Sequence, residues 1–275
     1  MWVLLMSDNW NFDGLVQDVL VKSGNNSCCG DISFPDTHKL DNPSNPQSTI
    51  SNDLLNEFEK YLQELGIIEV AYVNGINDYF LHGLNFDFNS AIVISYEISK
   101  SIHDEGAGDK AQAFNNELYE SFGNITYEIS DYLRSYGFET MVAHPREETI
   151  DFSHLAQKAG MGAIGKSGLL ISPKKGPNQK IAAILVNIEN LPLLNCNKHE
   201  WISRYCNYCN SCVKACPQEA LILNRKNKNV EFIADLCIGC TKGCVECIKA
   251  CPFYKKGYEH VFKKYKKLEA KLSQL

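Results

Sequence analysis

Nine of the twelve cysteines lie in one stretch of the chain, between Cys206 and Cys251. The first run ends on a proline and has two, two and three residues between its cysteines: Cys206, Cys209, Cys212 and Cys216, then Pro217. Thiolates at this spacing are typical ligands of a 4Fe–4S cluster, because three closely spaced cysteines bind three irons of one cube. In a reducing compartment, where disulfides are rare, such a dense group indicates metal binding or catalysis.

A second run also closes on a proline but holds five cysteines: Cys237, Cys240, Cys244, Cys247 and Cys251, then Pro252. Its last three positions match the same template, whereas the gap between Cys240 and Cys244 is one residue too long. In bacterial ferredoxins the last cysteine of each run ligates the cluster of the other run. This logic predicts two clusters: one on Cys206, Cys209, Cys212 and Cys251, the other on Cys216, Cys244, Cys247 and either Cys237 or Cys240.

Structural zinc sites also use pairs of cysteines two residues apart. Zinc does not require two Cys-x3-Cys-Pro closures in tandem, so the pattern favours iron–sulfur clusters and an electron-carrying module. The remaining cysteines, Cys28, Cys29 and Cys196, are interpreted as unligated thiols.

A glycine-rich segment, AGMGAIGKSGLLISPKKGP at 159–177, precedes the cysteines. Gly160, Gly162 and Gly165 satisfy the dinucleotide fingerprint, but the pattern follows a predicted helix instead of a strand, so a Rossmann site is not predicted. Glycine lets a ligand approach the backbone closely. A loop that cradles another large planar or phosphate-bearing cofactor fits better, with Lys166 in its middle; a structural turn is the alternative.

The elements that must position these residues form a mixed α/β pattern. A Pro/Asn/Ser linker at 41–50 leads to a helix that Ser51 caps and that runs to Leu65. Apolar, β-branched runs predict strands, and helical spacing predicts two further helices. The strands are Ile67–Val73, Ser90–Tyr96, Phe138–Ala143, Leu169–Ser172 and Ile181–Val186, and the helices cover 111–136 and 151–159.

Composition places the chain among globular proteins, since 44% of its 275 residues are hydrophobic. It has no apolar run long enough to span a bilayer and no basic leader, so we expect a cytoplasmic protein without a membrane partner. The net charge of −6 argues against binding nucleic acid by neutralising phosphates. Residues 255–275 nevertheless carry a net charge of +5. They predict an amphipathic helix with a solvated basic face, and a docking surface for an acidic partner or an RNA is the alternative.

The segment DFSHLAQKAGMGAIGKSGLLISPKKGP, followed by a strand and the two cysteine runs, resembles the epoxyqueuosine reductase family. It also resembles the more distant corrinoid-dependent reductive dehalogenases. The resemblance runs from about Ile67 to Pro252 and includes the strand SAIVISYE. It implies a nitroreductase-like α/β domain that binds cobalamin, fused to a ferredoxin-like domain with two 4Fe–4S clusters. By the same resemblance, Gly160, Gly162, Gly165 and Lys166 contact the corrinoid.

The domain division follows: 1–50, an N-terminal extension of unknown role; 51–195, the α/β corrinoid-binding domain; 196–254, the double-cluster domain; and 255–275, a basic C-terminal helix.

The chain departs from the family at the proton donor. Epoxyqueuosine reductases carry an Asp in a Val-Asp-Ser-Ala-Pro-like stretch, where this chain has VAHPR at 142–146. It also stops 23 residues after Pro252, without the helical repeats that grip tRNA, so tRNA is not an expected substrate. His144 and His154 are the candidate acids, because histidine can deliver a proton near neutral pH. Arg146 is a candidate for binding an anionic group, and Tyr96 is a weaker candidate.

The prediction is a cobalamin-dependent iron–sulfur oxidoreductase that acts on a small molecule or a modified base. A ferredoxin or flavodoxin-like protein would donate its electrons. The alternative is an electron-transfer protein that reduces a partner, for example a corrinoid protein, and has no substrate site of its own.

Overall fold

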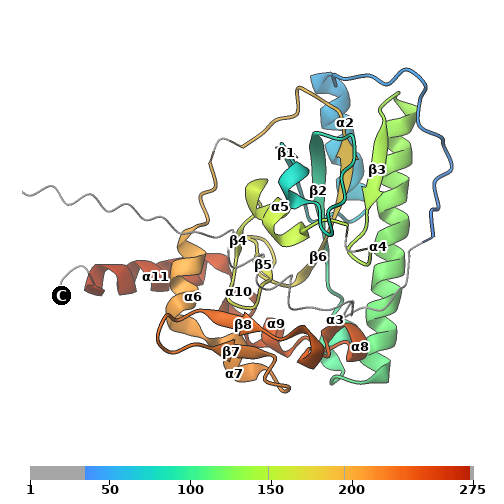
Figure 1. Cartoon of the computed structure of the whole chain (residues 1–275). Coiled ribbons are helices and arrows are strands. Elements are labelled where there is room, and N and C mark those ends of the chain that lie inside the picture. Colours follow the sequence, from blue (N-terminus) through green and yellow to red (C-terminus); the bar gives the residue numbers. More distant parts are fainter. Residues whose placement is uncertain (1–34, 148, 195, 273–275) are drawn as a thin grey trace, which may run out of the picture.

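A four-stranded antiparallel sheet organises the first half of the protein, in the order β1-β2-β6-β3 (Figure 1). The computed structural model describes residues 35–147, 149–194 and 196–272, so Cys28 and Cys29 lie outside the described residues. The strands are β1 (Glu69–Asn74), β2 (Ser90–Glu97), β3 (Thr140–Ala143) and β6 (Gln179–Val186). They confirm the predicted strands, with ends shifted by one or two residues.

Both faces of this sheet are buried, which explains why its central strands are almost continuously apolar. Ile92 and Ile94 of β2 face the helices α2 (Asn52–Glu64) and α4 (Asp109–Ser135), where they pack with Phe122. The intervening Ala91 and Val93 pack on the opposite side, against α5 (Phe152–Lys158). The alternation follows from the two-residue period of a strand.

The helix cap predicted at Ser51 is present, and α5 has a side-chain cap as well. The Ser51 hydroxyl accepts a hydrogen bond from the Leu54 amide and begins α2, and Asp151 caps α5 in the same way through the His154 amide. After α5, the glycine-rich segment forms the short pair β4 (Ala163–Ile164) and β5 (Leu170–Ile171), with a loop between them. The strand β5, and not a helix, follows this loop.

The cysteine-rich half consists of short elements that lie along the lower end of the sheet in Figure 1. In chain order they are α6 (Trp201–Cys209), α7 (Ser211–Ala215), β7 (Leu221–Leu223), β8 (Val230–Phe232), η2 (Ala234–Leu236), α8 (Gly239–Lys242), α9 (Glu246–Ala250), α10 (Pro252–Lys256) and α11 (Tyr258–Leu272). The basic C-terminal helix predicted within 255–275 is present as α11, although it begins at Tyr258 and not at Lys255. Gly257, at φ +79°, separates α10 from α11, and the proposed boundary at 254/255 falls inside α10.

Two apolar contacts hold the halves together. Val245 and Ile248 of the α9 region pack with Ile102 of α3 (Lys100–Asp104) and Leu118 of α4. On the other side, Ile171 of β5 packs into a second cluster with the α6 and α11 residues Ile202, Tyr205, Val261 and Tyr265. The basic helix α11 therefore buries its apolar face, as its spacing predicts. No helix in the described part of the chain is long and apolar enough to cross a membrane.

Candidate iron–sulfur and cofactor site

Four cysteines from three elements surround one pocket of about 350 Å³, part of which is open to solvent. Cys206 and Cys209 come from α6, Cys212 from α7, and Cys251 directly precedes α10. These are the four residues grouped by crossed ligation, and Cys247 also reaches the pocket wall. The structure therefore brings together residues that are up to 45 positions apart.

The second group of cysteines lies beside the first. The thiol of Cys244 interacts electrostatically with Cys237 and Cys216, and that of Cys247 interacts with Cys244 and Cys237. The Ala220 amide donates to the Cys216 sulfur at 3.3 Å. The structure thus gives Cys237 a place beside the other three proposed ligands.

The cysteines are partly withdrawn from water, and this sets their protonation. Burial raises the pKa of Cys206 to about 12 and that of Cys251 to about 11. A thiol in such a place becomes a thiolate when it binds a cation, and metal binding then releases its proton. Among the described residues, no three His, Cys, Asp or Glu side chains converge as they would around a single metal ion.

The glycine-rich loop packs on this cysteine pocket. A Cβ on Gly162 would lie 2.1 Å from the Ile171 carbonyl oxygen, so the close pairing of β4 with β5 requires glycine there. A Cβ on Gly165 would lie 3.6 Å from the Cys206 sulfur. Lys166 donates to Asn210 at 2.9 Å and lines the pocket. The loop therefore has a local structural role, because it packs against the first cysteine group.

A larger hollow, about 1090 Å³ with part of it open to solvent, lies where the two halves meet. Its walls come from the end of β2, from α3 and α4, from the loop before β6 and from α10; Tyr96, His103, Asn178 and Tyr254 contribute side chains. Tyr254 lies three residues after Cys251. Neighbouring residues of α10 line the two sites, Phe253 the cysteine pocket and Tyr254 the hollow, and the hollow also includes the sequence candidate Tyr96.

His103 is the least satisfied polar group in this wall. Its Nε2 lies 2.6 Å from Asn178 Oδ1, and its ring stacks on Tyr254 with the centroids 4.8 Å apart. Because the Asn178 amide nitrogen is directed at Glu97 and at the Ile98 carbonyl, its oxygen accepts from His103, which places the proton on Nε2. Nδ1 is left as a buried acceptor with no hydrogen-bond partner among the described residues.

His144 and Arg146 come together around Tyr119 of α4. Arg146 lies over the Tyr119 ring at 5.5 Å, and Lys180 donates to the Tyr119 hydroxyl at 2.8 Å. The His144 and Tyr119 rings form a T-shaped pair with their centroids 5.9 Å apart. His144 is fully buried, and burial lowers its pKa to about 4. It is therefore a neutral acceptor at neutral pH, which its Nδ1 shows by accepting from the Arg146 amide at 3.3 Å.

His154 lies elsewhere, at the start of α5. Its Nδ1 is 2.6 Å from the Asp151 carboxylate, and this hydrogen bond raises the pKa of His154. Because Asp151 also caps the helix, the pair stabilises a helix start. The structure does not group His154 with His144 and Arg146.

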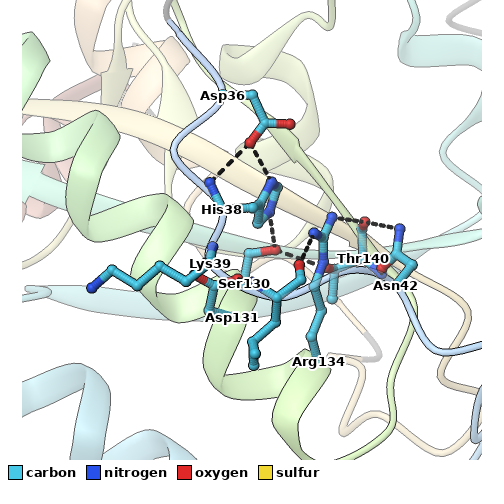
Figure 2. Close-up of polar contacts among 9 residues, drawn as sticks. Asp36, His38, Lys39, Asn42, Ser130, Asp131, Arg134 and Thr140 are labelled. Carbon is cyan, nitrogen blue, oxygen red and sulfur yellow. Dashed lines mark hydrogen bonds and ion pairs between the residues drawn. The ribbon is translucent and has the colours of Figure 1, made fainter.

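A network that the sequence did not reveal ties the segment 35–42 to α4 (Figure 2). His38 bridges Asp36 and Ser130, with both ring nitrogens at 2.7 Å from their partners. The order Asp–His–Ser resembles a hydrolase triad, but Ser130 is fully buried and its hydroxyl lies 2.6 Å from Thr140. No substrate carbonyl can reach that oxygen, so the network is not a nucleophilic site. It holds the segment 35–42 against α4, and we call it the clasp.

The comparisons with known proteins agree with the cysteine pattern. A family model described as "4Fe-4S binding domain" matches residues 199–222, which hold the whole first run. A tetrachloroethene reductive dehalogenase of Desulfitobacterium hafniense is 30% identical over 103 residues, which cover 38% of this chain and 18% of the dehalogenase. An epoxyqueuosine reductase of Synechocystis is 30% identical over 117 residues, covering 37% of this chain and 38% of that protein.

Solved structures show the same fold. A catabolic reductive dehalogenase superposes with a TM-score of 0.64 at 15% identity, covering 89% of this chain and 36% of its own. Another dehalogenase structure, whose description concerns B12-dependent dehalogenation, gives 0.59 at 15% identity over 78% of this chain and 34% of its own. Epoxyqueuosine reductase from Streptococcus thermophilus gives 0.52 at 16% identity over 74% of this chain and 66% of its own. The chain spans well under half the length of the first curated relatives it matches.

Proposed function

We propose that this chain, a divergent relative of the reductive dehalogenases and epoxyqueuosine reductases, is an oxidoreductase with two 4Fe–4S clusters and a bound cobalamin. Its α/β half is then the nitroreductase-like cobalamin domain that the resemblance implies. Cys206, Cys209, Cys212 and Cys251 would hold the first cluster, and Cys216, Cys237, Cys244 and Cys247 the second. The observation that carries the proposal is the hollow beside the first cysteine group, because Tyr254 belongs to its wall and follows Cys251 by three residues.

The hollow suits a large polar cofactor. Its wall combines the aromatic rings of Tyr96 and Tyr254 with polar side chains, and His103 Nδ1 is a buried acceptor in need of a donor. A corrinoid carries many amide N–H groups around its ring, and one of them would satisfy that atom. When bound, the corrinoid supplies a cobalt centre whose reduced states cleave or reduce substrate bonds.

The residues of this chain then have three tasks. Asn178 holds the imidazole of His103 in one tautomer. Tyr254, which stacks on His103, connects the hollow to the first cluster. The apolar packing around Leu118 fixes the position of the two halves relative to each other. Tyr119, with Lys180 donating to its hydroxyl and Arg146 over its ring, presents positive charge close to the same end of the sheet. This charge suits an anionic substrate or an anionic cofactor group, so we propose a small molecule or a modified base as substrate.

The test is a titration of the anaerobically reconstituted protein with cob(II)alamin, followed by EPR and visible absorbance. We expect two 4Fe–4S clusters per chain and a changed cobalt signal. Ser121→Trp fills the hollow from α4 and should weaken cobalamin binding at least tenfold while both cluster signals persist. Asn124→Trp, on the same helix but outside the hollow, is the matched control and should bind like the parent.

Two outcomes would contradict the proposal. An unchanged cobalt signal beside two intact clusters would make the chain an electron carrier that reduces a partner protein. Binding of cobalamin by Ser121→Trp with the parent's affinity would place cobalamin outside the hollow.

A further inference from the structure

The charge of this protein is divided unevenly between its halves. Residues 199–275 hold 14 Lys and Arg against seven Asp and Glu, a net charge of +7, whereas residues 1–198 carry −13. The cysteine-rich half is therefore a basic body attached to an acidic one. Such an asymmetry directs the approach of a charged partner, because the summed field attracts it to one end and repels it from the other.

Part of the basic charge is arranged as a stripe on α11. Lys263, Lys267 and Lys271 recur at intervals of four residues and are all exposed, while Val261 and Tyr265 on the other side are buried. The helix is thus fixed by its apolar side and presents ammonium groups to solvent.

Further exposed residues lie on and beside α6, the helix that carries Cys206 and Cys209. Arg204 of α6 is exposed and lies against Tyr265 and Glu269 of α11. One turn further along α6, between Cys206 and Cys209, Tyr208 is 51% exposed. The ammonium group of Lys228 lies 5.3 Å from the centre of the Tyr208 ring. We call the exposed residues Arg204, Tyr208 and Lys228 the basic face.

We propose that the basic face docks a small acidic electron-carrier protein of the ferredoxin class and that electrons enter the protein there. The inference rests on the proposed function, because it requires the first cluster. An exposed aromatic ring with a cation over it is a common interface composition, and here Tyr208 lies in the sequence between two proposed ligands of that cluster. One electron passes from the reduced carrier to the oxidised cluster; the carrier is oxidised, the cluster is reduced, and no bond or proton is transferred.

A protein partner fits this face better than RNA. A small carrier can cover the basic face alone, whereas an RNA that extended past it would meet the half with a charge of −13. The same negative half repels an acidic carrier, so the basic face is the surface on which the carrier docks.

The test is stopped-flow reduction of the cluster-loaded protein by a reduced plant-type 2Fe–2S ferredoxin. We expect the second-order rate constant to fall about tenfold or more between low and high salt, because steering by charge is screened. Lys228→Glu and Arg204→Glu, which each reverse one charge of the basic face, should each lower the low-salt rate about tenfold. Lys60→Glu, an equal change of charge at an exposed position of α2, should leave it unchanged.

An uncharged small reductant, photoreduced 5-deazariboflavin, should reduce all variants at the same rate, which shows that their clusters are intact. If the rate constant for reduction by ferredoxin changed neither with salt nor with the substitutions, the inference would be overturned and the proposed function would stand. Missing cluster absorbance before the carrier is added would instead count against the proposed function. Tight binding of tRNA that is lost in the same variants, with carrier-driven reduction unaffected, would assign the face to RNA and also overturn the inference.

Discussion

At the residue scale, His144 shows how burial decides what a side chain can do. Because burial lowers its pKa to about 4, the folded protein holds it neutral, whereas the unfolded chain binds a proton below about pH 6.5. Its contribution to stability is thus complete above pH 6.5 and is lost as the pH falls toward 4. We expect the free energy of unfolding to drop by about 1 kcal/mol more in the parent than in His144→Asn between pH 7.5 and 5.5. Denaturant melts at the two pH values measure this, and equal drops would show that His144 titrates normally in the fold.

Residues of the site differed in how far the sequence could predict them. The local spacing of the cysteines predicts two ligand groups before the fold is known, although it leaves open whether Cys237 or Cys240 belongs to the second group. His103 and Asn178 are 75 positions apart and meet only because β2, α3 and β6 end at the same edge of the sheet. Gly162 was interpreted as a cofactor contact, yet the nearby Ile171 carbonyl oxygen already leaves no room for a Cβ at this position.

At the scale of elements, the clasp between 35–42 and α4 depends on Arg134. Its guanidinium donates to the Leu40 carbonyl at 2.6 Å and to the Thr140 carbonyl at 3.0 Å (Figure 2). We expect Arg134→Ala to destabilise the protein by about 2 kcal/mol, since partly buried acceptors lose a charged donor. Hydrogen exchange should then accelerate at the amides of Lys39 and Leu40, which donate to Asp131. Unchanged protection at these two amides would mean that the segment is held by other contacts.

Regular elements were predictable where periodicity and caps agree, as for α2 with Ser51. The clasp was not, because 35–50 has no periodic pattern and is held by side chains of distant elements. The C-terminal helix was predicted with its start three residues too early, because Gly257, at φ +79°, separates α10 from α11.

For the whole molecule, the contact of α8 with the start of α4 keeps the halves in the arrangement that creates the hollow. Gly243, at φ +61°, follows α8, and a Cβ there would lie 2.5 Å from the Ala111 backbone of α4. Its amide also donates to the Gln112 side chain at 2.8 Å. Gly243→Ala therefore adds a clash with backbone to the cost of a left-handed alanine, about 1–2 kcal/mol. We expect a lower melting temperature and at least tenfold weaker cobalamin binding. Gly83→Ala isolates the left-handed cost, because Gly83 has φ +70° and nothing within 4 Å of its Cβ position. If both variants kept the parent's affinity for cobalamin, the hollow would not depend on the packing of α8 against α4.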